Sequence, residues 1–417
     1  MSADAIAAAA ALSWDDLQVH AAPEPDRING PSSAQAQLRL FGRPEREVRV
    51  TLFRDHHAWC PYCQKVWLWL EERRIPYRIR KVTMFCYGEK ERWYKQLVPS
   101  GMLPALQLDD RLITESDRIL EALEACFGSF GPGMHDPRVL PLRQLERLLF
   151  RAWCQWLCYR HTPRSEAEAR GQFRQLAAAM EQSLAAGGGP FLLGAEFGTA
   201  DLVFVPYLER MNASLAYYKG YGLRQEHPDI HRWFCGLEQR PTYLGTQSDF
   251  HTHAHDLPPQ MGGCFASGEP HQQALAERID QGPWPIGAPG LLDPETSQPE
   301  PLDAAAIALS RVLRHRGPLA ERNPLPLQRF DPALRSALSF LVTGEAVPPP
   351  PRSAAGLRHL RDRISVPRDM PLHAARRLRQ ALETTARLDP ATPEAQGESI
   401  PTQHRRDQDP RPFLVRP

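Results

Sequence analysis

The 417-residue sequence lacks the features that would place it in a membrane or on a polyanion. No apolar run reaches the ~18 residues that a membrane-spanning helix requires. The formal net charge is only +1, so charge gives no reason to expect nucleic acid or an anionic membrane as a partner. We therefore expect a cytoplasmic protein with no membrane association.

Cysteine is scarce as well, with eight residues at irregular spacing. Such spacing suits reduced thiols better than the disulfide framework of a small secreted protein. Residues 7–11 are all alanine and resemble a signal-peptide core, but Asp4 precedes them and the first basic residue is Arg27. We expect residues 1–47 to be an arm or linker without a fold.

Proline, by contrast, is abundant. The 41 prolines are about twice the ~5% share that is usual in proteins. Stretches rich in proline and glycine at 23–33 and 283–301 indicate linkers. The hydrophobic share of 42% is that of a globular protein, and the length allows two or three domains.

The most informative stretch is 48–70, which has the pattern of a strand, a loop and a helix. It begins with β-branched residues and ends with apolar residues at helical spacing. Between them, Cys60-Pro61-Tyr62-Cys63 stands where the helix would begin. A CxxC motif beside a βαβ pattern is typical of a thioredoxin-like redox site.

The start of a helix favours a thiolate at Cys60. Its first N–H groups have no intrahelical partner and the helix dipole adds positive potential there, and the thiolate is the reactive form of cysteine. Cys63 lies one turn further on, within reach for a disulfide. His56 and His57 would assist if protonated. The alternative is half of a zinc site, but no second CxxC is present, so no metal is expected.

The order of elements from 48 to 128 is βαβ–αββα. The CPYC motif, the LPAL segment at 103–106 and the Thr-Glu-Ser sequence at 114–116 together resemble the N-terminal domain of cytosolic glutathione transferases. The CPYC motif is most similar to their glutaredoxin-type, cysteine-based branch. The resemblance implies a thioredoxin-like domain at 48–128 that binds glutathione as a co-substrate.

The same resemblance implies the residues that hold glutathione. Leu103 precedes a cis Pro104 and turns its backbone toward the cysteinyl part, while Glu115 and Ser116 hold the γ-glutamyl end. Anion binding at a helix N-terminus supports the role of Ser116, although simple helix capping is an alternative. The lysine that related enzymes often carry at the position of Leu97 is missing, which leaves Lys95 as the candidate for the glycyl end.

The segment 137–256 has helical periodicity and resembles the all-helical second domain of the family. Trp153 and Trp156 are candidates for an acceptor pocket, with core packing as the alternative. Cys154 and Cys158, four residues apart, are interpreted as small buried hydrophobes. The histidines at 251, 253 and 255 are predicted to lie on one side of an extended segment, where a transition metal is the alternative to a plain loop end.

The last part, 270–388, is predicted to be a helical extension, with helices at 302–315, 332–342, 354–364 and 372–388. Residues 299–417 contain 19 arginines, no lysine and 13 acidic residues. The arginines of 299–388 are a candidate surface for a protein partner, with ordinary solvated helix faces as the alternative. Residues 389–417 are predicted to be disordered. A CPYC enzyme with such an extension resembles the iota-type glutathione transferases of photosynthetic organisms.

The predicted fold class is α/β plus all-α: a thioredoxin-like domain, an all-helical transferase domain and extra C-terminal helices. The predicted function is glutathione-dependent thiol transfer through Cys60 and Cys63, on mixed disulfides or dehydroascorbate. One alternative is a non-catalytic glutathione-binding scaffold whose extension recruits a protein. Another is an iron–sulfur cluster held between two protomers. Homodimers are common in the family that the sequence resembles.

Overall fold

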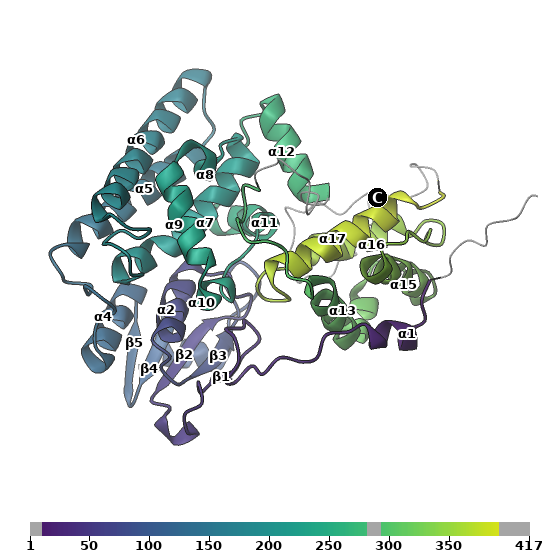
Figure 1. Cartoon of the computed structure of the whole chain (residues 1–417), viewed down its shortest axis with the longest axis horizontal. Helices are drawn as coiled ribbons and strands as arrows, with labels where there is room; N and C mark the ends of the chain where they lie inside the picture. Colours follow the sequence, from purple (N-terminus) through teal and green to yellow (C-terminus); the bar gives the residue numbers. More distant parts are fainter. Residues whose placement is uncertain (1–10, 282–292, 392–417) are drawn as a thin grey trace, which may run out of the picture.

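The computed structural model describes residues 11–281 and 293–391. Figure 1 shows a sheet with flanking helices, a helical bundle beside it, and a further group of helices joined to both. No helix in these two ranges is long and apolar enough to cross a membrane. Most of the predicted disordered tail, residues 7–10 of the alanine run and half of the linker at 283–301 lie outside the described residues.

A five-stranded mixed sheet forms the first domain. The strand order is β1-β3-β2-β4-β5, with β2 and β3 parallel and every other neighbouring pair antiparallel. The strands are β1 (Leu38–Arg39), β2 (Val50–Asp55), β3 (Tyr77–Val82), β4 (Ala105–Leu108) and β5 (Arg111–Thr114). Two parallel strands need a crossover connection, and the helix that begins at the CxxC motif connects β2 to β3.

Helices cover both faces of this sheet. The helices of the domain are α2 (Pro61–Glu72), α3 (Arg92–Leu97) and α4 (Ser116–Phe127). Successive strand residues point to opposite faces, so Leu52 packs in the core with α2 and α4, whereas Phe53 packs with Tyr94 of α3. Helix α3 is short, with six residues that begin at Arg92.

The second domain is helical and is built around one buried helix. Its helices are α5 (Val139–Leu157), α6 (Pro163–Gly187), α7 (Thr199–Lys219), α8 (Leu223–Glu226), α9 (Pro228–Glu238), α10 (Pro241–Leu244), α11 (Phe250–Met261) and α12 (Pro270–Gln281). Helix α7 is buried on nearly all sides and packs against α2, α5, α11 and α12. At its start, the Asp201 carboxylate accepts hydrogen bonds from the N–H groups of Gly198 and Leu192.

The C-terminal extension forms a separate hydrophobic core. Its helices are α13 (Ala304–Arg314), α14 (Arg316–Arg322), α15 (Leu327–Thr343), α16 (Ala354–Arg363) and α17 (Leu372–Arg387). The four predicted helical segments are confirmed, and the structure adds α14. Figure 1 shows α17 running from the helical domain across the extension. The thioredoxin-like sheet, the helical domain and the additional helices confirm the predicted fold class.

The described part of the N-terminal arm differs from the expected linker. Helix α1 (Trp14–Val19) packs on α13 and α15, with Leu17 fully buried in the core of the extension. Further along, β1 pairs with β3, and buried Arg39 forms an ion pair of 2.9 Å with Glu71 of α2. A short 3-10 helix, η1 (Glu45–Glu47), follows. These few apolar and paired residues suffice to fix an arm that has little periodicity.

Candidate functional site

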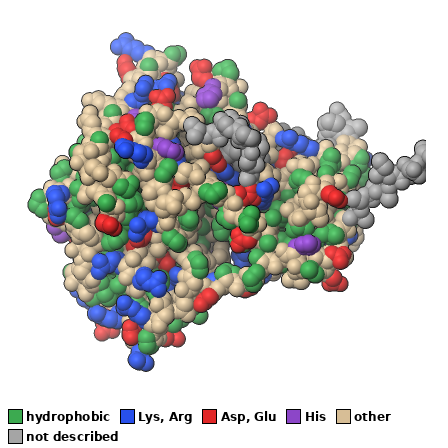
Figure 2. Space-filling view, viewed as in Figure 1, with side chains coloured by type: hydrophobic (Ala, Val, Ile, Leu, Met, Phe, Trp, Pro, Cys, Tyr) green, Lys and Arg blue, Asp and Glu red, His purple; other side chains and the backbone are tan. Residues whose placement is uncertain are grey.

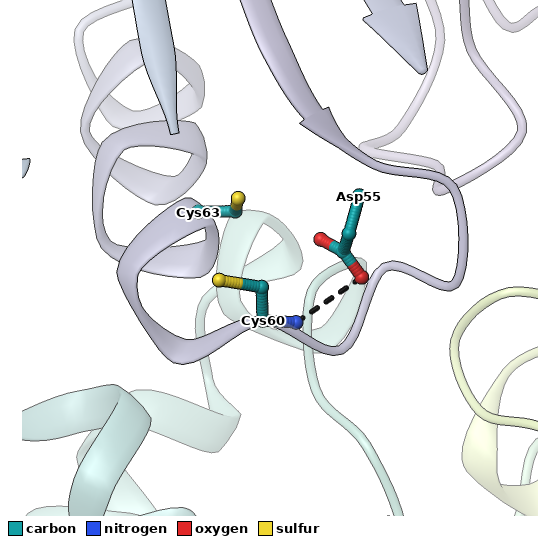
Figure 3. A group of neighbouring side chains, drawn as sticks. All are labelled: Asp55, Cys60 and Cys63. Atoms are coloured by element: carbon teal, nitrogen blue, oxygen red, sulfur yellow. Dashed lines mark hydrogen bonds between the residues drawn. The ribbon is translucent and has the colours of Figure 1, made fainter. Parts of the chain in front are cut away.

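The two cysteines of the CxxC motif lie where β2 ends and α2 begins. Cys60 is the N-cap of α2, Pro61 occupies its first turn, and Cys63 follows within the helix. The two sulfur atoms and a carboxylate oxygen of Asp55 all lie within 4.8 Å of one another. Figure 3 shows this group at the end of the strand, with both sulfur atoms on the helix side. The arrangement places the Cys60 thiol at a helix N-terminus, the position that the sequence predicts.

Asp55 is the buried acid of this group, and the sequence analysis missed it. Its Oδ2 accepts hydrogen bonds from the backbone N–H groups of Trp59 at 2.6 Å and Cys60 at 3.2 Å. Its Oδ1 is buried and has no hydrogen-bond partner among the described residues. The carboxylate therefore fixes the loop before Cys60 and keeps one free oxygen near the thiols. Its position at the end of a buried strand was the only signal in the sequence.

Cys63 differs from Cys60 in its electrostatic surroundings. Burial raises the pKa of the Cys63 thiol well above its ordinary value, and the hydrogen bond with Cys60 and the charge of Asp55 raise it further. Cys63 therefore stays protonated and acts as a donor to the sulfur of Cys60. This difference favours Cys60 over Cys63 as the thiolate.

The loop that carries Cys60 is held from behind by α7 and α11. The Trp59 indole Nε1 donates a hydrogen bond to His253 Nδ1 at 3.0 Å, and His253 Nε2 lies 2.8 Å from Glu209. The guanidinium of Arg210 donates to the carbonyl of Trp59. The helical domain thus fixes the backbone beside Cys60.

The histidines of 251–255 lie on a helix and not on an extended segment, which corrects the prediction. Because side chains on a helix turn by about 100° per residue, His253 faces Trp59, while His251 and His255 share another face. His255 Nε2 lies 2.6 Å from a carboxylate oxygen of Asp280. His251, His255 and Asp280 place ligand-type atoms within 4.8 Å of one another, as do Asp55 and the two cysteines.

The residues expected to bind glutathione lie at the edge of this site. The Leu103–Pro104 peptide bond is cis. The pairing of Phe53 with Ala105 places Pro104 beside the end of β2, which leads to Cys60. Ser116 is the buried first residue of α4, and Glu115 before it has a φ of 66°, which residues other than glycine rarely adopt. Such backbone outliers cluster at functional sites.

Lys90, and not Lys95, lies near the thiols. The side chain of Lys95 is exposed to solvent. Lys90 Nζ donates to the carbonyl of Thr83 at 2.9 Å. Burial lowers the pKa of Lys90, and its electrostatic interaction with the two cysteines of the CxxC motif counteracts that shift. No sequence pattern indicates a role for Lys90, because this residue precedes α3 in a stretch without regular periodicity.

The tryptophans proposed for an acceptor pocket are core residues. Trp153 and Trp156 are 1% and 2% exposed and belong to the hydrophobic core. Their indole N–H groups are already used, by Ser214 and Glu166. Helix α5 turns this face toward α6 and α7, so the pocket interpretation is wrong and core packing is correct.

The sequence indicates small buried hydrophobes at Cys154 and Cys158, but their thiols also form hydrogen bonds. Their thiols share a hydrogen bond, and a second one joins Cys158 to Cys264, which follows α11. These bonds lower the pKa of Cys158 to about 4 and raise the pKa values of the other two. All three cysteines are half-buried and free of disulfides.

Comparisons with known proteins match the first two domains. The model of the glutathione S-transferase N-terminal domain matches residues 59–126, and that of the C-terminal domain matches residues 163–234. Glutathione S-transferase DHAR2 of Arabidopsis thaliana is 24% identical over 189 residues, which are 45% of this chain and 84% of that protein. Glutathione S-transferase L3 of the same plant is 23% identical over 193 residues, 46% of this chain and 79% of that protein.

Among solved structures, the dehydroascorbate reductase of Chlamydomonas reinhardtii has 19% sequence identity and a TM-score of 0.40. The similarity covers 48% of this chain and 93% of that one. Neither of the two family models extends past residue 234, so the extension lies outside both matches.

Proposed function

We propose that this chain, which carries the N- and C-terminal domains of a glutathione S-transferase, is a glutathione-dependent thiol transferase that acts through a Cys60 thiolate. The observation that carries the proposal is the position of Cys60. It caps α2, and its sulfur lies beside a Cys63 thiol whose raised pKa keeps it protonated. A thiolate there is stabilised by the helix N-terminus and by a hydrogen bond, as nucleophilic cysteines require.

The proposed reaction is an exchange of disulfides. The Cys60 thiolate attacks the glutathionyl sulfur of a mixed disulfide R–S–S–G, which forms Cys60–S–S–G and releases R–S⁻. A second glutathione thiolate then attacks the glutathionyl sulfur, which releases oxidised glutathione and restores the Cys60 thiolate. Alternatively, Cys63 loses its proton and attacks the Cys60 sulfur, which gives an internal disulfide and free glutathione.

For glutathione binding we propose Leu103, Pro104, Glu115 and Ser116. The position of Pro104 beside the end of β2 and the positive φ of Glu115 support this set. The N–H groups that begin α4 would receive the γ-glutamyl carboxylate. We propose Lys90 in place of Lys95 for a contact near the thiols, because its ammonium is influenced by both cysteines.

Dehydroascorbate is a second candidate substrate. A dehydroascorbate reductase is among the similar structures, and the curated relative DHAR2 aligns over most of its own length. Its reduction would consume two glutathione molecules, which supply two electrons and two protons and leave as oxidised glutathione. The iota-type assignment rests on the CPYC motif and the extension together, and it is part of this proposal.

The test is a glutathione-dependent assay on wild type, Cys60→Ser and Cys63→Ser with a small glutathionylated disulfide. Loss of turnover in Cys60→Ser alone would establish the route through a single thiol. Loss in both variants would establish the route through the internal disulfide. Equal inactivity of wild type and Cys60→Ser, with glutathione still bound, would reject the enzyme and leave the scaffold.

A second variant tests the glutathione site apart from the chemistry. Ser116→Ala should weaken glutathione binding, measured by calorimetry, while the Cys60 thiol keeps its rate of alkylation by iodoacetamide. Ser183→Ala, at a half-buried helical serine of α6, is the control and should leave glutathione binding unchanged.

A further inference from the structure

A cavity of about 540 Å³ lies between the sheet domain and the C-terminal extension. Lys81 of β3 and His56, directly after β2, line it on the sheet side. Residues of α13, α14, α16 and the segment 364–370 line it on the other side. We call it the extension cavity. Cys60, Cys63 and the residues proposed for glutathione binding do not line it, although His56 lies four residues before Cys60.

The walls of the extension cavity carry an excess of positive charge. Five cationic side chains and one carboxylate, that of Asp369, line the cavity. The cationic residues are Lys81, Arg311, Arg322, Arg363 and Arg368. This carboxylate is already engaged by Arg368 at 2.8 Å. Lys81 and Arg322 have no ion-pair partner within residues 11–281 and 293–391. Positive charge in the cavity is therefore left without a counter-charge from the part of the chain that the structure describes.

The pKa values of two lining residues are consistent with an excess of positive charge in the cavity. Burial, followed by the charges of Arg54, Arg27 and Arg311, lowers the pKa of Lys81 to about 8. Burial and Arg363 lower the pKa of His359 to about 3. Grouped cations that are partly removed from water are unfavourable unless an anion compensates them.

The rest of the wall is apolar. Val312, Leu360, Ile364 and Met370 supply aliphatic surface between the cationic groups. Sites for small organic molecules typically enclose ~300–1,000 Å³ and combine apolar walls with a few placed polar groups. The volume and lining of the extension cavity fit that description. An inorganic ion alone would leave most of this surface unused.

We propose that the extension cavity binds a phosphorylated organic molecule. The arginine guanidinium matches the oxygens of a phosphate with paired hydrogen bonds. Five cations against one paired carboxylate exceed what a single carboxylate ligand would neutralise. The apolar wall would take the organic body, and Lys81 and the arginines would take the phosphate groups. The site is distinct from the one proposed for thiol transfer.

Two variants and one control test the proposal by calorimetry. The probes are ADP, inorganic pyrophosphate and citrate, in a buffer without phosphate. Lys81→Gln and Arg322→Gln each remove a lining cation that has no ion-pair partner in the described chain, and Arg329→Gln removes a cation of α15 that does not line the cavity. The melting temperature of each variant shows that it is folded.

ADP should bind wild type and Cys60→Ser equally, and saturating glutathione should not displace it. Lys81→Gln and Arg322→Gln should each weaken ADP binding about tenfold, whereas Arg329→Gln should leave it unchanged. Pyrophosphate should bind more weakly than ADP, because it lacks an organic body. The proposal is overturned if no probe binds up to millimolar concentration, if citrate equals ADP, or if glutathione competes. An inactive enzyme that still binds ADP would reject the proposed function but not this site.

Discussion

Trp59 and His253 couple the loop before Cys60 to helix α11 by a buried hydrogen bond of 3.0 Å. Because the indole N–H can only donate, His253 Nδ1 must accept, and its proton is carried by Nε2 toward Glu209. Burial lowers the pKa of His253, so the ring is neutral. One side of the candidate active site is thus fixed by a histidine from the second domain.

Replacing Trp59 by Phe should therefore destabilise the protein beyond the loss of volume. The substitution leaves His253 Nδ1 buried without its donor, which costs about 1–3 kcal/mol. Urea denaturation of wild type and variant measures the difference. Trp69→Phe is the matched control, because Trp69 is equally buried but its indole nitrogen has no hydrogen-bond partner among the described residues. Equal losses for the two variants would contradict the role of the bond.

The extension should depend on the buried ion pair between Arg379 of α17 and Asp249, the N-cap of α11. Arg379→Met leaves the Asp249 carboxylate buried without its partner, which should lower the free energy of unfolding by about 3–5 kcal/mol. The exposed pair of Arg314 and Glu24 provides a control, since Arg314→Met should cost under ~1 kcal/mol. Comparable losses in urea denaturation would mean that α17 is not held by this pair.

Asp55→Asn should lower the pKa of Cys63. The charge of Asp55 raises that pKa, and the asparagine removes the charge while it keeps an oxygen for the N–H groups of Trp59 and Cys60. Thiolate absorbance against pH in the Cys60→Ser background measures the shift, after subtraction of the variant that lacks both cysteines. Asp109→Asn, at an exposed carboxylate, should cause no shift. An unchanged Cys63 titration with Asp55→Asn would show that the two groups do not interact.

His359 should make the folded protein sensitive to mild acid. Its pKa is about 3 in the folded state and 6.5 as the ordinary value. The unfolded chain therefore binds the proton first, and stability falls as pH drops below about 6.5 and continues to fall toward 3. His359→Gln should flatten this decline, by up to ~1.4 kcal/mol per pH unit. Urea midpoints between pH 7 and 5 measure it, and the exposed His135→Gln should leave the decline as in wild type.

The sequence was sufficient wherever a local pattern carried the structure. The β-branched and helical periodicities placed β2, α2 and the helices of the extension within a few residues. The CxxC motif predicted two cysteines at the start of a helix, and the structure places them there. Prediction from the sequence failed where contacts between distant residues determine the structure. The apolar Leu17 and the charged Arg39 fix an arm that has no periodicity. Asp55 interacts with the loop before Cys60 only because the fold buries it beside the cysteines.

The positions of the charged side chains in the extension could not be predicted from the sequence either. The number of arginines in the extension predicted a surface for a protein partner. Several of these arginines instead line the extension cavity or form buried ion pairs. Figure 2 shows positive and negative side chains interspersed over the visible face, without a large area of one sign. The composition revealed the excess of arginine, but only the fold shows which way the side chains point.

The contact between the segment before α1 and helix α15 constrains the order in which the protein can fold during synthesis. The N–H group of Leu12 donates to the Ser339 hydroxyl at 2.8 Å, although 327 positions separate them. At ~5–20 residues per second, the segment before α1 must wait roughly 15–65 s for its partner helix to be made. The sheet and the helical domain are therefore synthesised completely before the leading segment can dock on α15.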